Sequence, residues 1–337
     1  MIFPFSALVG QDQMKLGLVL NVIDPSIGGL LVMGEKGTGK STAVRALAEL
    51  LPEYPVSKGC AFNCDPDDRF LCTSCAERLE KQGRLDSEPR KMRVVELPLG
   101  ITEDRLVGTM DIEHALQYGE KRFEPGILAG ANRNFLYVDE VNLLEDHIVD
   151  LLLDSAAMGR NIVEREGVSF SHPSRFMLVG TMNPEEGDLR PQLLDRFGLS
   201  VYVHSLRDKE QRIEILRRRA AFDADPEGFA GSCQREQQGL AEKIVQARES
   251  LLQVAVPEAI LDKVVTITSS IKVDGHRADI VMLRAAKALA AFRGSEETTL
   301  DDVKDICSLA LVHRLKRLPF QEIGSELQQL EKVLAEI

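Results

Sequence analysis

Short apolar runs alternate with amphipathic helical patterns over the first 220 residues of the chain. Turn residues bound five of these runs, which predict strands at residues 28–34, 93–98, 135–140, 175–183 and 199–204. Two of the runs are almost wholly apolar, as is typical of a strand buried on both faces of a sheet. Strands that alternate with helices favour a parallel sheet. We therefore expect an α/β domain over residues 1–222, with helices on both faces of its sheet.

The periodicity is helical throughout beyond residue 222. A polar stretch with proline and glycine, residues 223–239, predicts a linker. The helical patterns that follow carry start and stop signals: Gly294 ends one, and Thr299 and Asp302 stand at capping-box spacing at the start of the next. We expect a smaller helical domain over residues 240–337.

The overall charge narrows the classes of partner. The formal net charge is −12, so the field of the whole chain repels nucleic acid. Hydrophobic residues make up 44% and charged residues 28%, which is ordinary for a globular protein. No apolar run is as long as a membrane span, and the first residues lack the basic segment of a signal peptide. We expect a cytoplasmic protein that binds neither nucleic acid nor membrane.

The segment "GEKGTGKS" fits the phosphate-loop pattern G-x-x-x-x-G-K-[ST] at every fixed position. It follows an expected strand and opens an expected helix, which is the context that the motif requires. Backbone N–H groups of such a loop wrap phosphates, Lys40 reaches the β- and γ-phosphates, and Ser41 ligates Mg²⁺. The residues expected to bind nucleotide are Gly34, Glu35, Lys36, Gly37, Thr38, Gly39, Lys40, Ser41 and Thr42.

Two later strands end in polar residues that suit the same site. Asp139 and Glu140 follow an apolar strand, which suits Asp139 to hold Mg²⁺ and Glu140 to orient or deprotonate the attacking water. Asn183 ends the next strand and can hydrogen-bond that water or the γ-phosphate, because ligands of open parallel sheets lie beyond the carboxyl ends of the strands. The alternatives are a solvated acidic pair, and an asparagine that starts a turn before Pro184.

Two arginines are candidates for contacts with the γ-phosphate. Arg196 ends a short helical segment 13 residues after Asn183, and we expect it to point out of its subunit toward a neighbour's phosphate. Arg284 stands in the middle of an apolar helical pattern, so we expect it to be buried and paired with nucleotide. The alternatives are ion pairs within the chain, of Arg196 with Asp195 and of Arg284 with Asp279.

Four cysteines stand within 16 residues, in an insertion expected over residues 59–92. Their spacing is Cys60-x₃-Cys64-x₇-Cys72-x₂-Cys75. Clustered cysteines in a reducing compartment favour metal over disulfides. Four thiolates can close a tetrahedral Zn²⁺ site with no open position. An iron–sulfur cluster, a redox pair and plain thiols are the alternatives.

Taken together, these motifs resemble the AAA+ ATPases, and more narrowly the ATPase subunit of the magnesium chelatases. The phosphate loop alone is generic, whereas other segments are far narrower. The segments that carry the resemblance include "FPFSALVGQDQMKLGLVLNVIDPSIGGLLVMGEKGTGKSTAVRAL", "ITEDRLVGTMDIEHAL", "FEPGILAGANRNFLYVDEVNLL" and "RFMLVGTMNPEEGDLRPQLLDRFGL".

The resemblance implies an AAA+ P-loop domain followed by a helical lid domain. It implies the Walker A motif at Gly34–Ser41, the Walker B motif at Asp139 and Glu140, sensor 1 at Asn183, an arginine finger in trans at Arg196 and sensor 2 at Arg284. Members of the family use ATP and Mg²⁺. They form rings, typically hexamers, that dock on an AAA-like subunit with an integrin-type domain, while a large third subunit holds the porphyrin and inserts the metal.

The cysteine cluster departs from the pattern of the photosynthetic members. This departure leaves open whether the chelated metal is magnesium or cobalt. The rival interpretation is a MoxR-like remodelling ATPase that matures client proteins with an integrin-domain partner. A nucleic-acid motor is disfavoured by the net charge of −12.

Overall fold

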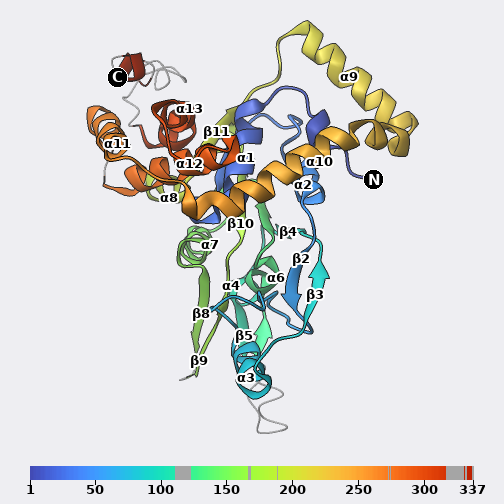
Figure 1. The fold of residues 1–337 in the computed structure, drawn as a ribbon, viewed down its shortest axis with the longest axis vertical. Helices are drawn as coiled ribbons and strands as arrows, with labels where there is room; N and C mark the ends of the chain where they lie inside the picture. The colour runs from blue at the N-terminus through green and yellow to red at the C-terminus, as the bar shows by residue number, and fades with distance from the viewer. Residues whose placement is uncertain are drawn as a thin grey trace.

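A five-stranded parallel sheet forms the centre of the protein (Figure 1). The computed structural model describes residues 1–110, 123–165, 168–187, 189–271, 273, 275–315, 330 and 332–335. The sheet has the order β11-β1-β10-β7-β4, and every neighbouring pair is parallel. Its strands are β1 (Leu30–Gly34), β4 (Val94–Leu97), β7 (Phe135–Val138), β10 (Met177–Met182) and β11 (Leu199–Val203). Each strand lies within one of the five predicted runs, so the predicted α/β fold is confirmed.

Alternate residues of the central strands bury opposite faces of the sheet. Leu30 and Val32 join a core with helices α1 (Asp12–Ile23) and α2 (Lys40–Leu50). Leu31 and Met33 join a second core with α6 (Ile127–Ala131) and α7 (Asp146–Met158). The apolar runs therefore lack the polar alternation of a half-exposed strand, because water reaches neither face.

Three antiparallel hairpins lie on the side of the molecule away from the C-terminal helices (Figure 1). In the first, β2 (Tyr54–Ser57) and β3 (Ser87–Arg90) enclose α3 (Thr73–Gln82), and α3 and β3 lie within the expected insertion, whereas β2 precedes it. The others are β5–β6 (Gly108–Met110 and Phe123–Pro125), which follows α4 (Glu103–Val107), and β8–β9 (Arg160–Arg165 and Val168–Pro173).

The segment predicted as a linker, residues 223–239, is helical instead. It contains the end of α9 (Lys209–Ala224) and the first half of α10 (Pro226–Ser250). Asp225 caps α10 and accepts a hydrogen bond from the Gly228 N–H at 2.9 Å, and Pro226 occupies the first turn of the helix, where proline is favoured. These polar and proline residues therefore start a helix here, although the same residue types are typical of linkers. The domain boundary itself stays a prediction.

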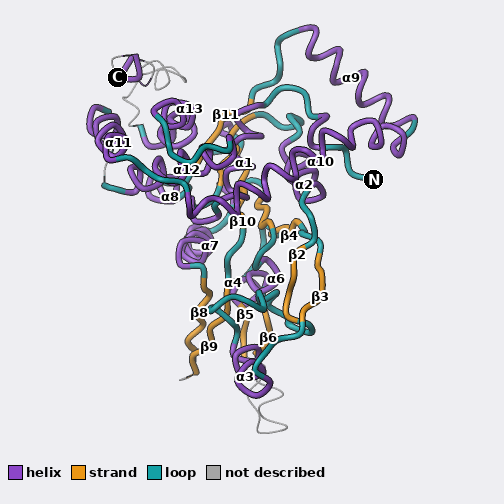
Figure 2. Tube along the Cα trace, in the orientation of Figure 1, coloured by secondary structure: helices purple, strands orange, loops and turns teal. Residues whose placement is uncertain are grey.

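The C-terminal part that follows is helical, as Figure 2 shows. It comprises the end of α10, α11 (Glu258–Ser270), α12 (Arg277–Arg293), α13 (Leu300–Leu311) and the short η6 (Val312–Arg314). The predicted capping box of Thr299 and Asp302 starts α13, and Gly294 ends α12 with a φ of 76°. These helices share the core of α1 and β11. Residues 316–329 of the expected lid lie outside the described residues.

None of the helices in the described ranges is both long enough and apolar enough to cross a membrane.

Candidate nucleotide site

The phosphate loop joins the carboxyl end of β1 to the first turn of α2. Gly34 has a φ of 140°, and a Cβ there would lie 2.0 Å from the Val203 carbonyl oxygen, so only glycine fits. Gly37 and Gly39 have φ values of 80° and 83°, in the left-handed region. The loop thereby presents the amino end of α2, with its free N–H groups and partial positive charge, to the space beyond the sheet.

Lys40 spans the loop that it belongs to. Its Nζ donates to the Gly34 carbonyl at 2.6 Å and to the Glu35 carbonyl at 3.1 Å. Partial burial lowers the pKa of its ammonium, and the nearby Asp139 and Glu140 act in the opposite direction. A phosphate would therefore compete only with two neutral carbonyls for this cation.

The two acidic residues at the end of β7 are fixed by Thr181 of the adjacent strand β10. The Thr181 hydroxyl donates to Asp139 Oδ1 at 2.5 Å and accepts from the Glu140 N–H at 3.1 Å. Tyr137 adds a hydrogen bond to Asp139 Oδ1 at 3.2 Å, and burial raises the pKa of this tyrosine to about 12. Glu140 has a φ of 52°, a strained conformation typical of functional residues.

Lys36 holds the carboxylate of Glu140 by an ion pair. Its Nζ lies 2.9 Å from Glu140 Oε1 and 2.7 Å from Glu186 Oε1. The hydrogen bonds to Glu186 and to Glu140 raise the pKa of this ammonium. Lys36 was predicted to belong to the nucleotide loop, but its ion pairs were not predicted, and neither Glu186 nor Thr181 was among the predicted site residues. Only the order of the strands reveals these contacts.

A cavity of about 400 Å³ brings the predicted residues together. Its lining includes Lys40, Ser41, Asp139, Glu140 and Asn183. The Asn183 side chain also accepts a hydrogen bond from the Glu185 N–H at 3.3 Å, so it caps the turn Pro184–Glu186 while it lines the cavity. The interpretation of Asn183 as the start of a turn is therefore confirmed, and its contact with water or the γ-phosphate stays a prediction.

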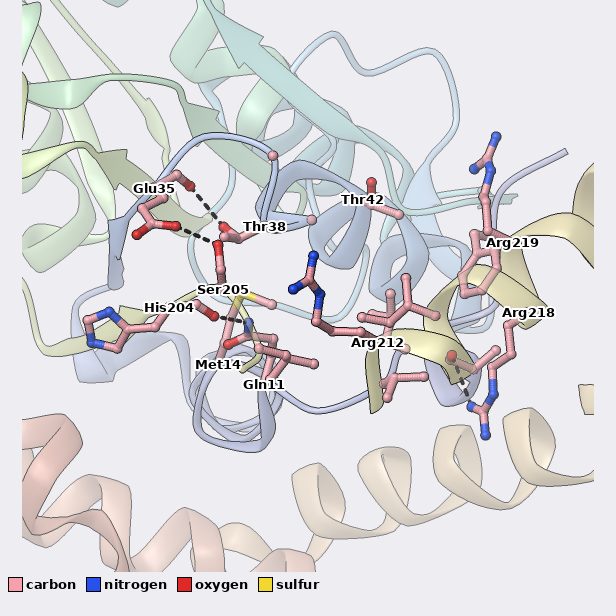
Figure 3. Close-up of a pocket in the computed structure, with 18 of the residues that line it drawn as sticks. Gln11, Met14, Glu35, Thr38, Thr42, His204, Ser205, Arg212, Arg218 and Arg219 are labelled. Carbon is pink, nitrogen blue, oxygen red and sulfur yellow. Dashed lines mark hydrogen bonds between the residues drawn. The ribbon is translucent and has the colours of Figure 1, made fainter. Parts of the chain in front are cut away.

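A larger cavity of about 690 Å³ adjoins the phosphate loop and shares Gly37, Thr38, Gly39 and Thr42 with the first (Figure 3). Met14 of α1 lines its apolar side, and Arg212 reaches into it from α9 (Figure 3). The cavity has room for a nucleoside. No local sequence pattern indicates this cavity, because its walls come from segments that lie about 200 residues apart.

Both candidate arginines lie at the opposite end of β1 from the phosphate loop. Arg196 ends α8 (Pro191–Arg196), and its carbonyl lies against Gly28, just before β1. Arg284 of α12 donates to the carbonyl of Ser26, in the same segment. The five residues of β1 separate that end from the loop by about 15 Å. Neither guanidinium contacts the phosphate loop of its own chain in this conformation.

The contacts of these arginines differ from the sequence-based alternatives. Arg196 pairs with Asp150 at 2.8 Å and Asp154 at 2.7 Å, both on α7, rather than with Asp195. Arg284 is exposed, so the expectation that it is buried was wrong. The apolar positions beside it face the core, whereas its own position on α12 faces outward.

Asp195, next to Arg196, is held by the C-terminal helices. Arg314 of η6 is buried, and its Nε lies 3.0 Å from Asp195 Oδ1. The same guanidinium donates to the carbonyls of Asp195 at 3.0 Å, Phe197 at 2.8 Å and Gly198 at 2.9 Å. Burial lowers the pKa of Arg314 to about 10, and Asp195 opposes this shift. Arg314 was not among the predicted site residues, because nothing in its local sequence pattern distinguishes it.

The four cysteines of the insertion gather at one point. All their Sγ atoms lie within 4.8 Å of one another, and all four side chains are buried. The structure thus brings together the residues that the spacing predicted as one metal site.

Comparisons with known proteins agree with this geometry. Residues 70–197 match the family model described as AAA domain (dynein-related subfamily), and residues 261–333 match the AAA lid domain. A protein of Methanocaldococcus jannaschii named as a magnesium-chelatase subunit ChlI homolog is 54% identical over 99% of this chain and 91% of its own length. The magnesium-chelatase subunit ChlI of Synechocystis is 52% identical over 100% of this chain and 94% of its own length.

Solved structures place the chain in the same group. A chain from the complex between subunits BchI and BchD of magnesium chelatase is 48% identical, with 99% of both chains covered and a TM-score of 0.55. An ATPase-like protein of Cytophaga hutchinsonii is only 18% identical with a TM-score of 0.63, and it supports the fold alone. Because relatives that are more than 50% identical span nearly the whole chain, this protein belongs to the family of the ChlI ATPase subunit of magnesium chelatase.

Proposed function

We propose that this chain is the ATP-hydrolysing motor subunit of a complex that inserts a metal ion into protoporphyrin IX. The observation that carries the proposal is the 400 Å³ cavity in which the phosphate loop faces Asp139 and Glu140. This is the arrangement that phosphoryl transfer from ATP to water requires. The names of the relatives favour a chelatase over the MoxR-like remodelling ATPase.

Each residue of the cavity has a role that its position suits. The loop amides and Lys40 bind the β- and γ-phosphates, and Ser41 and Asp139 hold Mg²⁺. Bound MgATP supplies the phosphoryl group and the divalent charge that neutralises it. Glu140 orients the attacking water and takes its proton, and Asn183 hydrogen-bonds the water or the γ-phosphate. The hydrogen bond from Thr181 keeps the Asp139 carboxylate turned toward the loop.

Arg196 and Arg284 act on the ATP of a neighbouring subunit. Their location at the far end of β1 from the phosphate loop supports this role, because neither can approach its own nucleotide without a large rearrangement. A head-to-tail contact that places this end of one chain against the cavity of the next closes into a ring, which we propose to be a hexamer. An arginine supplied in this way stabilises the transferring phosphoryl group.

The ring works with two further subunits. One is an AAA-like subunit with an integrin-type domain, as the complex of the related BchI and BchD subunits suggests. The other is a large subunit that binds the porphyrin. Mg²⁺ gives up its water shell reluctantly, which provides a reason for its insertion to need ATP. Besides ATP and Mg²⁺, the four clustered cysteines suit one structural Zn²⁺.

Replacement of Glu140 tests the proposal. The substitution Glu140→Gln preserves the shape of the side chain but removes the base, so the variant is expected to bind ATP with unchanged affinity and to lose hydrolysis by about 10²-fold or more. The matched control is Glu185→Gln, which removes an exposed acid from the adjacent turn and is expected to hydrolyse ATP normally.

The function in metal insertion is tested by reconstitution. The wild-type chain, mixed with the integrin-domain and porphyrin-binding subunits, is expected to support ATP-dependent appearance of the metalloporphyrin absorption spectrum, and Glu140→Gln is not. Hydrolysis without metallation in the full mixture would reject the chelatase and leave an ATPase of another purpose. Trials with Mg²⁺ and with Co²⁺ decide which metal is inserted.

A further inference from the structure

The sulfur atoms of Cys60, Cys64, Cys72 and Cys75 form a compact tetrad. The four atoms lie within 4.8 Å of one another, and Cys60 Sγ and Cys72 Sγ are 3.8 Å apart. Zn–S bonds of about 2.3 Å at tetrahedral angles put sulfurs about 3.8 Å apart. Disulfide sulfurs would be about 2.05 Å apart, so the tetrad has the spacing of ligands to one ion.

Hydrogen bonds to three of the sulfurs suit ligating thiolates. Cys60 Sγ accepts from the Phe62 N–H and Cys64 Sγ accepts from the Cys72 N–H, both at 3.3 Å. Arg78 Nη2 donates to Cys75 Sγ at 3.0 Å. Donors of this kind orient metal ligands and offset part of their negative charge. Four soft ligands with no open position favour zinc, because iron–sulfur clusters place several irons and sulfides between the thiolates and need a wider cage.

The loop between the first two cysteines joins the insertion to both other hairpins. Phe62 packs on Phe123 of β6 at a ring distance of 6.4 Å, and on Phe170 and His172 of β9 at 5.8 and 4.7 Å. Phe123 and Phe170 stack on each other at 4.0 Å. One aromatic cluster therefore ties together three segments that are distant in sequence.

Polar contacts attach the same loop to the segment that precedes β7. Asn63, at a φ of 50°, donates to the carbonyls of Gly130 and Asn132, each at 3.3 Å. Asn132 returns a hydrogen bond to the Phe62 carbonyl at 2.7 Å. Asp65, just after Cys64, pairs with Arg133 at 2.8 Å, so the chain that follows Phe62 is fastened to residues 130–133.

We propose that the four cysteines bind one Zn²⁺ and that this ion fastens the β5–β6 and β8–β9 hairpins to the ATPase core. Two-stranded hairpins are marginally stable alone, and the core of the insertion contains few apolar residues besides the cysteines. A structural zinc supplies folding free energy that such a small core lacks. The inference goes beyond the proposed motor function, since the nucleotide cavity shares no residue with the tetrad.

Metal analysis of the full chain, purified without chelator, tests the site. We expect one zinc per wild-type chain, and Co²⁺ exchanged for zinc should show the visible bands of tetrahedral cobalt–thiolate. Cys60→Ser should lose the metal, whereas the control Cys233→Ser, outside the tetrad, should keep it. Protein without stoichiometric metal, or with iron and sulfide instead, overturns the zinc site.

Limited proteolysis of the same samples tests the fastening. Loss of zinc, by chelation or by Cys60→Ser, is expected to speed cleavage within the described strands of the two hairpins, residues 108–110, 123–125, 160–165 and 168–173, by at least tenfold, with ATP affinity unchanged. Retained ATP binding shows that the variant has folded. If cleavage of these hairpins is as slow without zinc as with it, the ion does not hold them, and that half of the proposal fails. If ATP affinity also collapses, the ion supports the whole domain rather than the hairpins.

Discussion

Lys36 and Lys40, both in the phosphate loop, differ in their exposure and in the groups that they contact. Lys40 is partly buried against loop carbonyls, whereas the side chain of Lys36 is 65% exposed and pairs with Glu140 and Glu186. The ion pair with the Lys36 ammonium makes the Glu140 carboxylate a weaker base. In this conformation Lys36 therefore restrains the residue that we propose to activate water, and bound nucleotide would have to draw the two apart.

Replacement of each lysine separates these roles. Lys36→Met removes a solvent-exposed ion pair, so kcat for ATP should change by no more than about fivefold. Lys40→Ala removes the cation proposed for the γ-phosphate and should abolish turnover. Steady-state ATPase assays compare the two. Loss of activity in Lys36→Met equal to that in Lys40→Ala would place Lys36 on the phosphates instead.

The sequence predicted residues of this site whose position depends on the local chain. Gly34 and Lys40 follow from motif spacing, and Asp139 follows from the end of an apolar strand. Thr181 and Glu186 could not be predicted, because their contacts depend on β10 lying between β1 and β7. Strand order is set by packing of the whole sheet, and a single sequence does not encode it locally.

At the scale of elements, the C-terminal helices hold α8 in place. Arg314 of η6 binds the Asp195 carboxylate and three carbonyls at the end of α8, and Arg277 of α12 adds an exposed ion pair to Asp195 at 3.2 Å. Arg196 is the next residue along the chain. Movement of the lid would therefore carry the proposed finger with it.

Replacement of each of the two arginines that pair with Asp195 measures how firmly the C-terminal helices hold α8. Arg314→Met leaves buried carbonyls without donors, so we expect a loss of about 3 kcal/mol in unfolding free energy. Arg277→Met removes only the exposed pair and should cost about 1 kcal/mol or less. Urea unfolding monitored by circular dichroism gives both values. Equal, small losses would mean that α8 is held by its apolar contacts alone.

The elements themselves were predictable to different degrees. Strands β1, β7 and β10 were recovered because both of their faces are buried, which makes them apolar runs with sharp ends. Residues 223–239 were predicted as a linker because α10 is largely exposed until Ile244 and Ala247 reach the core. An exposed helix has a polar composition, which a linker shares.

At the scale of the whole molecule, the chain separates its phosphate-binding cavity from its arginines. The cavity lies at the carboxyl end of β1, while Arg196 and Arg284 lie beside the segment that precedes this strand. On the proposed function, a single chain has one half of an ATPase site at each end. Without a rearrangement of the chain, a head-to-tail contact between chains is needed to combine the two halves, so we expect the activity to depend on assembly.

Mixing two inactive variants tests this arrangement. Arg196→Ala has an intact cavity but no finger, and it should lose turnover on the order of 10³-fold. Lys40→Ala has the finger but no working cavity. Mixed rings should recover part of the activity, at interfaces where an intact cavity meets an intact finger. The recovery must be partial, because random rings contain few such interfaces.

Two results would contradict the trans arrangement. One is near-normal turnover by Arg196→Ala alone, which would make its pairs with Asp150 and Asp154 purely structural. The other is a mixture, shown by labelled subunits to have exchanged, with no more activity than the sum of its parts. In that case either Arg196 serves its own subunit after a rearrangement of α8, or hydrolysis needs every site in the ring at once. The ATPase activity of wild-type chain diluted with Lys40→Ala distinguishes these two explanations. If Arg196 serves its own subunit, activity falls linearly with the fraction of Lys40→Ala chain. If hydrolysis needs every site in the ring, activity falls much more steeply.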